Sequence, residues 1–115
     1  MFCSGLDLSL AKSTINSAEN GRMMYDFMTD ALNRIRNGPF VSVAAIGGSC
    51  IGGGLELVSA ADYRIAIQKE AGSTAPYFQS VHAKIGATPG WGGLSRSIQI
   101  MGRKDALSML SLIHI

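Results

Sequence analysis

The chain has 115 residues, of which 47% are hydrophobic and 16% are charged, a composition typical of one folded domain and not of a disordered tail. Its formal net charge of +2 is small and its basic residues are scattered, so neither a nucleic-acid partner nor an anionic membrane surface is indicated. Residues 41–61 are apolar enough to raise the question of a membrane helix. Three consecutive glycines and the buried charge of Glu56 make that structure unfavourable, and we expect no membrane segment.

The two cysteines, Cys3 and Cys50, lie far apart, and neither has a Cys or His neighbour at a metal-ligand spacing. We therefore expect no metal site and no disulfide framework. Reduced cysteines are typical of an intracellular protein, and no basic region followed by an apolar run marks a signal peptide.

The first third of the chain predicts a turn, a loop and a helix. Residues 2–8 have the pattern of a strand end that enters a tight turn at Gly5, and the polar residues 9–20 predict a loop. Apolar residues at helical spacing predict a helix over residues 22–37, which Pro39 would end.

The rest of the chain predicts alternating strands and helices separated by glycine-rich turns. We expect strands at 40–46 and 63–67, turns at 47–54 and 86–93, a loop at 68–80, and helices at 55–61, 94–101 and 104–113. This alternation favours the α/β class. The chain begins directly on a motif and ends in an uncapped apolar helix, so we expect residues 1–115 to be part of a longer domain.

Residues 47–56 (GGSCIGGGLE) follow a predicted strand and open a predicted helix, where unpaired backbone N–H groups favour an anion. A P-loop would need Lys and then Ser or Thr after the last glycine, and the dinucleotide fingerprint has a different glycine spacing. Two interpretations remain open, which are an oxyanion hole and a tight turn that binds nothing.

Three motifs together resemble the enoyl-CoA hydratase/isomerase, or crotonase, superfamily. They are residues 2–8 (FCSGLDL), residues 43–57 (VAAIGGSCIGGGLEL) followed by 61–66 (ADYRIA), and residues 86–96 (GATPGWGGLSR). The resemblance implies a partial crotonase (ClpP-like) fold of repeated β-β-α units, with N-terminal and C-terminal parts of the family domain missing. Residues 68–80 are longer than the family needs, so an insert is expected there.

The resemblance also implies site residues. Backbone N–H groups of Leu6 and Gly53 would form the oxyanion hole, and Glu56 matches the first of two catalytic glutamates in family hydratases. The second position falls on His82, although an insert before it could displace this residue. The further residues implied to contact the substrate are Gly5, Asp7, Leu8, Gly52, Gly54 and Trp91.

Residues 81–86 (VHAKIG) and Trp91 are most similar to the branch of the family that decarboxylates malonyl-type thioesters such as ethylmalonyl-CoA and methylmalonyl-CoA. Hydratase or isomerase activity and an inactive fragment are the alternatives. The resemblance implies an acyl-CoA substrate with no separate cofactor, because coenzyme A belongs to the substrate. It also implies a homotrimeric or hexameric parent and a proofreading role in fatty acid metabolism, in the cytosol or alternatively in mitochondria.

Overall fold

The computed structural model describes residues 1–68, 72 and 75–111 and confirms a mixed α/β architecture. The described elements, in chain order, are α1 (Leu8–Thr14), α2 (Ala18–Asn37), β1 (Val43–Ile46), β2 (Cys50–Ile51), α3 (Gly53–Ala60), β3 (Tyr63–Ala66), β4 (Phe78–Gln79), the 3-10 helix η1 (Ala83–Ile85), α4 (Gly93–Met101) and α5 (Arg103–Ser111).

Residues 9–20 are largely helical, so the predicted loop is wrong. The Asp7 carboxylate accepts hydrogen bonds from the N–H groups of Ser9 (2.8 Å) and Leu10 (3.1 Å), and this cap begins α1. Ser17 caps α2 in the same way. The polar residues that suggested a loop thus include two helix caps, and α1 has no buried residue that could mark it by apolar periodicity.

The other predicted helices are confirmed with shifted ends. Helix α2 begins earlier than residue 22 and ends at Asn37, just before Gly38 and Pro39. Helix α4 ends at Met101, and its C-cap residue Gly102 has a positive φ of 84°. Helix α5 ends at Ser111, and the predicted continuation to residue 113 lies outside the described residues.

The described strands form two parallel pairs, and each pair joins one strand from each of two β-β-α repeats. The first strands of the repeats, β1 and β3, pair with Val43 opposite Tyr63, and the second strands, β2 and β4, pair with Cys50 opposite Phe78. Cys3 adds a parallel bridge to Cys50. The repeats predicted from the family resemblance are therefore present, and each repeat contributes one strand to each pair.

Strands β2 and β4 were not predicted, because two residues are too few to show a period-2 pattern. They lie inside the segments 47–54 and 68–80, which were predicted to be a turn and a loop. The predicted strands at 40–46 and 63–67 are confirmed as the shorter β1 and β3. Part of the expected insert, residues 69–71 and 73–74, lies outside the described residues.

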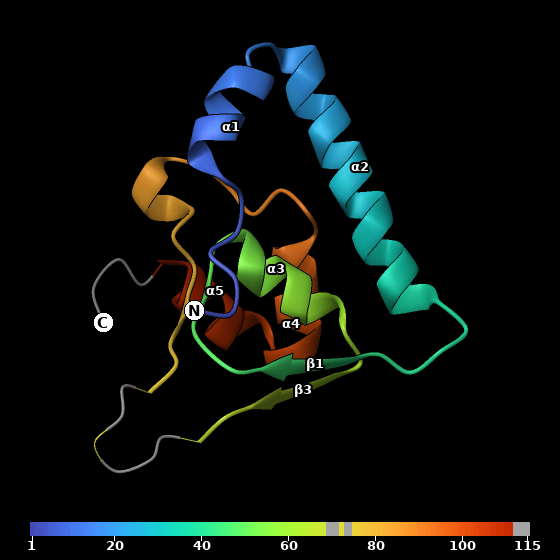
Figure 1. Ribbon diagram of the computed structural model, residues 1–115, viewed down its shortest axis with the longest axis vertical. Coiled ribbons are helices and arrows are strands. Elements are labelled where there is room, and N and C mark those ends of the chain that lie inside the picture. Colours follow the sequence, from blue (N-terminus) through green and yellow to red (C-terminus); the bar gives the residue numbers. More distant parts are fainter. Residues whose placement is uncertain (69–71, 73–74, 112–115) are drawn as a thin grey trace.

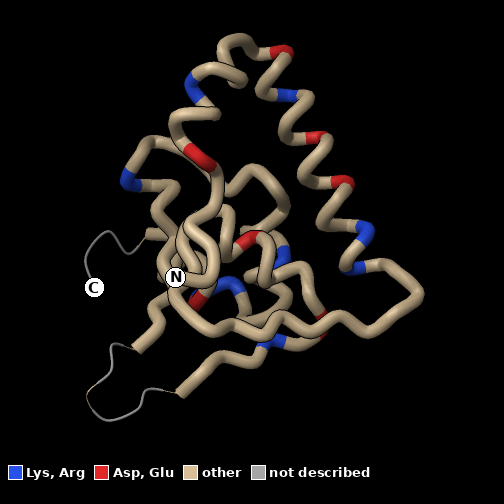
Figure 2. Tube along the Cα trace, viewed as in Figure 1, with Lys and Arg blue, Asp and Glu red and all other residues tan. Residues whose placement is uncertain are grey.

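Helix α3 packs against helix α4, and α4 packs against α5, while the long α2 projects along one side of the molecule (Figure 1). A small core of Ile46, Cys50 and Val58 joins β1, β2 and α3. Charged residues of both signs are distributed along α2, whereas α1 carries Lys12 alone (Figure 2). Among the described residues, no helix has the length and apolar character needed to cross a membrane.

Candidate active site

Three segments that are distant in sequence meet around one cavity of about 590 Å³. The Ile51 N–H donates to the Cys3 carbonyl (2.9 Å), which joins the first segment to β2, and the Gly52 N–H donates to the Gln79 carbonyl (2.9 Å), which joins β2 to β4. The predicted site residues that line the cavity are Gly5, Leu6, Asp7, Leu8, Gly52, Gly53, Glu56, His82 and Trp91.

The two predicted oxyanion-hole donors, Leu6 and Gly53, both line this cavity. No hydrogen bond from either N–H to another group of the described residues is present. Gly5 has a φ of 85°, and a Cβ atom built on it would lie 2.7 Å from the Gly53 nitrogen. Glycine at position 5 therefore permits the turn and also keeps the Gly53 N–H uncovered.

The neighbouring glycines have different roles. Gly52 has a positive φ of 53°, and its carbonyl accepts the Leu55 N–H (2.9 Å) at the start of α3. Gly54 is buried, and a Cβ atom there would collide with the Cys3 carbonyl oxygen. Gly54 does not line the cavity, and its close approach to Cys3 gives it a packing role; its contact with substrate stays a prediction.

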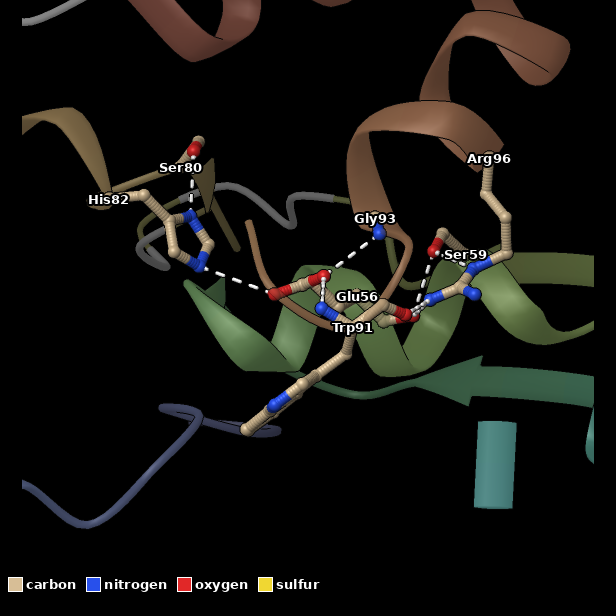
Figure 3. A network of polar contacts seen from close by, with 7 residues as sticks. All are labelled: Glu56, Ser59, Ser80, His82, Trp91, Gly93 and Arg96. Carbon is tan, nitrogen blue, oxygen red and sulfur yellow. Dashed lines mark hydrogen bonds and ion pairs between the residues drawn. The ribbon is translucent and has the colours of Figure 1, made fainter. Parts of the chain in front are cut away.

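Glu56 is only 3% exposed, and its two carboxylate oxygens differ in their surroundings. Oε2 accepts hydrogen bonds from the N–H groups of Trp91 and Gly93, both at 2.8 Å. Oε1 lies 3.4 Å from Nε2 of His82 (Figure 3). One oxygen is thus saturated by backbone donors, and only Oε1 remains for proton exchange with the imidazole.

His82 is held on its other side by a buried hydroxyl. Its Nδ1 lies 3.1 Å from Oγ of Ser80, and its side chain is 14% exposed. The segment before His82 has therefore not displaced it from Glu56. The sequence prediction missed Ser80, because a single serine after a two-residue strand carries no distinctive signal.

The remaining predicted residues that line the cavity are Trp91, Leu8 and Asp7. Trp91 packs its indole ring against Gly53, where a Cβ atom would collide with it. Leu8 is 61% exposed. The Asp7 carboxylate caps helix α1, which is a structural role.

Arg96 is a second buried charged residue of this region, and the sequence prediction gave it no role. It is 4% exposed, and its guanidinium donates to Ser59 Oγ (2.9 Å), the Glu56 carbonyl (3.2 Å) and the Trp91 carbonyl (2.5 Å). Burial lowers the pKa of Arg96, and the nearby Glu56 carboxylate acts in the opposite direction. Among the described residues, no group of three or more His, Cys, Asp or Glu side chains could hold a metal ion.

The parallel pairs of the β-β-α repeats and the glycine-walled cavity with a buried carboxylate are consistent with a crotonase-type protein. The chain belongs to the enoyl-CoA hydratase/isomerase family, whose model matches residues 1–114. This match confirms both the predicted family and the predicted partial crotonase fold.

Its relatives include proteins named ethylmalonyl-CoA decarboxylase. The chain is 41% identical to the one from Gallus gallus over 98% of this chain and 36% of the relative, and 43% identical to the one from Xenopus laevis over 96% and 34%. Among solved structures, it is similar to an enoyl-CoA hydratase from Bacillus anthracis, with a TM-score of 0.81, 27% identity, and coverage of 95% of this chain and 39% of that one. The chain thus spans about a third of the length of these decarboxylases.

Proposed function

We propose that the complete protein containing this chain decarboxylates a malonyl-type acyl-CoA thioester, with ethylmalonyl-CoA as the first candidate and methylmalonyl-CoA as the second. The observation that carries the proposal is that one cavity is lined by two N–H groups without a partner in the described residues, by the buried Glu56 and by its neighbour His82. Identities of 41% and 43% to proteins named ethylmalonyl-CoA decarboxylase support the choice of substrate.

The oxyanion-hole donors suit the first step of this reaction. When the bond between the α-carbon and the carboxylate breaks, CO2 leaves and the electron pair stays on the α-carbon, from which it delocalises onto the thioester oxygen as an enolate. The N–H groups of Leu6 and Gly53 would stabilise that oxygen, and one such donor contributes about 2.7–4 kcal/mol in other enzymes. No base is needed to begin the reaction.

The Glu56–His82 pair suits the second step, in which the α-carbon receives a proton. Either side chain lines the cavity and can deliver a proton, and solvent then restores it to the pair. Because backbone donors occupy Oε2 of Glu56, the pair offers one exchangeable position between Oε1 and the imidazole. A single protonation needs only one such position.

The composition of the pair favours decarboxylation over hydration. Family hydratases use two glutamates to handle water, whereas the corresponding pair here is one carboxylate, Glu56, and one imidazole, His82. A substrate carboxylate would be repelled by a second glutamate and tolerated by His82. Isomerisation remains the second candidate, because Glu56 lines the cavity and could shuttle a proton by itself.

We expect His82→Glu in the complete protein to reduce the decarboxylation rate by at least about tenfold, because the new carboxylate would oppose the substrate's own charge. His82→Gln is the matched neutral control and should retain more activity than His82→Glu. Steady-state rates with ethylmalonyl-CoA measure both variants, and unchanged kinetics for His82→Glu would exclude this explanation.

Substrate profiling tests the function itself. The complete protein is incubated separately with ethylmalonyl-CoA, methylmalonyl-CoA and crotonyl-CoA, and the thioesters are followed by mass spectrometry. Loss of CO2 from a malonyl-type thioester without hydration of crotonyl-CoA is the expected result. Hydration of crotonyl-CoA alone would assign a hydratase and refute the decarboxylase.

Further properties of the complete protein belong to the same proposal. Coenzyme A enters as part of the substrate, so the proposed reaction requires no separate cofactor. A homotrimer or hexamer is the proposed assembly, which light scattering of the complete protein tests. A proofreading role in fatty acid metabolism and a cytosolic location, with mitochondria as the alternative, are tested by cell fractionation and metabolite analysis.

A further inference from the structure

Arg96 contacts both parts of the candidate site without lining its cavity. From the first turn of α4, its guanidinium reaches the carbonyl of Glu56, the carbonyl of Trp91 and the hydroxyl of Ser59 (Figure 3). It thereby joins helix α3 to the loop that precedes α4.

The same loop is also held from the opposite direction. Oε2 of Glu56 accepts the N–H groups of Trp91 and Gly93, while Arg96 donates to the Trp91 carbonyl. Both polar groups of the Trp91 backbone are therefore fixed by charged side chains, and such hydrogen bonds are stronger than neutral ones.

The loop backbone is shaped to admit the guanidinium. Gly92 has a positive φ of 81°, and a Cβ atom built on it would lie 2.7 Å from Nη1 of Arg96. A Cβ atom on Gly93 would lie 2.5 Å from Cγ of Glu56. The two glycines thus allow the buried cation and the buried carboxylate to approach the loop from its two sides.

We infer that Arg96 is a positioning residue for the reaction. By fixing the Trp91 carbonyl, it holds the indole against Gly53, one of the two oxyanion-hole residues, and by fixing the Glu56 carbonyl it sets the position from which the carboxylate reaches His82. This inference rests on the proposed function for its kinetic consequence, but the geometry of Trp91 can be measured without turnover.

The test uses the complete protein with Arg96→Met, which retains an unbranched side chain without the charge or the donors. The kcat for ethylmalonyl-CoA should fall by about 10- to 100-fold, because small displacements of reacting groups are costly, while KM should change less than about threefold. Arg103→Met, on the exposed start of α5, is the matched control and should retain both constants.

A spectroscopic readout separates positioning from stability. The protein is labelled with 5-fluorotryptophan, and the Trp91 signal is assigned as the 19F resonance that disappears in Trp91→Phe. In substrate-free protein well below its melting temperature, this resonance should shift in Arg96→Met and stay in place in Arg103→Met. If ethylmalonyl-CoA is not turned over, the proposed function fails while this resonance still tests the role of Arg96.

A milder variant covers the case in which Arg96→Met does not fold. Ser59→Ala removes one partner of the guanidinium and leaves the charge, so the Trp91 resonance should shift by less and kcat should fall by about 2- to 10-fold. A lowered melting temperature with an unchanged Trp91 resonance and unchanged kcat, in either variant, would overturn the inference, because Arg96 would then act on stability alone.

Discussion

At the scale of single residues, the candidate site depends on a glycine whose missing side chain leaves a backbone N–H group accessible. Gly5 and Gly102 have nearly the same φ, 85° and 84°, but only Gly5 lies against a candidate oxyanion donor, since nothing lies within 4 Å of a Cβ atom on Gly102. Substitution of Gly102 therefore measures the effect of a positive φ alone, whereas substitution of Gly5 would also cover the Gly53 N–H.

We therefore expect Gly5→Ala and Gly102→Ala to share the strain of a positive φ and to differ in activity. Gly102→Ala should lose roughly 1–2 kcal/mol of stability, because alanine disfavours a positive φ. Gly5→Ala should lose more, because its Cβ atom would also lie 2.7 Å from the Gly53 nitrogen. Only Gly5→Ala should lose about 100-fold in kcat, because its methyl group would cover the donor. Thermal melting and steady-state kinetics of the complete protein measure the two effects, and equal activity losses would contradict the role assigned to Gly53.

Ser80 offers a second test at this scale. Ser80 is 4% exposed, and when its hydroxyl donates to Nδ1 of His82, the proton of the neutral imidazole is left on Nε2, which faces Glu56. Ser80→Ala should lower kcat by about tenfold, because the ring can then adopt the other tautomer. Ser97→Ala, at another buried serine, should have little effect.

A double-mutant cycle shows whether Ser80 acts through the imidazole. In a His82→Gln background, Ser80→Ala should cause no further loss of kcat, since the interaction has already been removed. A full additional loss in that background would mean that Ser80 acts on the site by another route.

At the scale of elements, Asp62 ties the beginnings of β1 and β3 together. Its Oδ2 accepts the N–H and the hydroxyl of Ser42, both at 2.8 Å, and these hydrogen bonds lower the pKa of Asp62. A carboxylate whose pKa is lower in the folded state stabilises the fold above its unfolded pKa of about 3.9, and that stabilisation is lost as the pH falls through the folded value.

Asp62→Asn should therefore lower the melting temperature at pH 6 and reduce its decline as the pH falls below about 4. Melting curves of the complete protein between about pH 2.5 and 6 test this. Asp105→Asn is the exposed control. A steeper acid decline in Asp62→Asn than in the unmodified protein would contradict the assignment.

Elements also show what could be predicted from the sequence and why the rest could not. Helix α2 and strands β1 and β3 carry apolar periods that are visible without a structure, and residues of all three glycine-containing motifs line the cavity. Helix α1 buries nothing, and β2 and β4 are two residues long, so no periodicity could mark them. Ser80 and Arg96 reach the site through pairing and packing of distant segments, which local patterns do not encode.

At the scale of the whole molecule, many large apolar side chains of the described residues are exposed. On the β1–β3 pair, Val43 and its partner Tyr63 are 54% and 62% exposed, and Ile65 is 64% exposed. On α2, Phe27 is 70% exposed. Because large exposed apolar surfaces cause association, residues 1–115 alone should be poorly soluble.

We expect residues 1–115 expressed alone to show no cooperative melting transition and no activity with ethylmalonyl-CoA, whereas the complete protein shows both. The small core of Ile46, Cys50 and Val58 is the reason, because it buries too little apolar area to offset the conformational entropy of the chain. Circular dichroism melting measures the transition, and a sharp transition in the isolated chain would refute this expectation.

The most direct test of the central claim is the mass of the product formed from ethylmalonyl-CoA in D2O. If the complete protein releases CO2 to an enolate that an acid in the cavity then protonates, each butyryl-CoA formed should carry one deuterium, and crotonyl-CoA should remain unhydrated. Intact ethylmalonyl-CoA together with hydrated crotonyl-CoA would contradict the account, because the cavity would then serve water addition and not the loss of CO2.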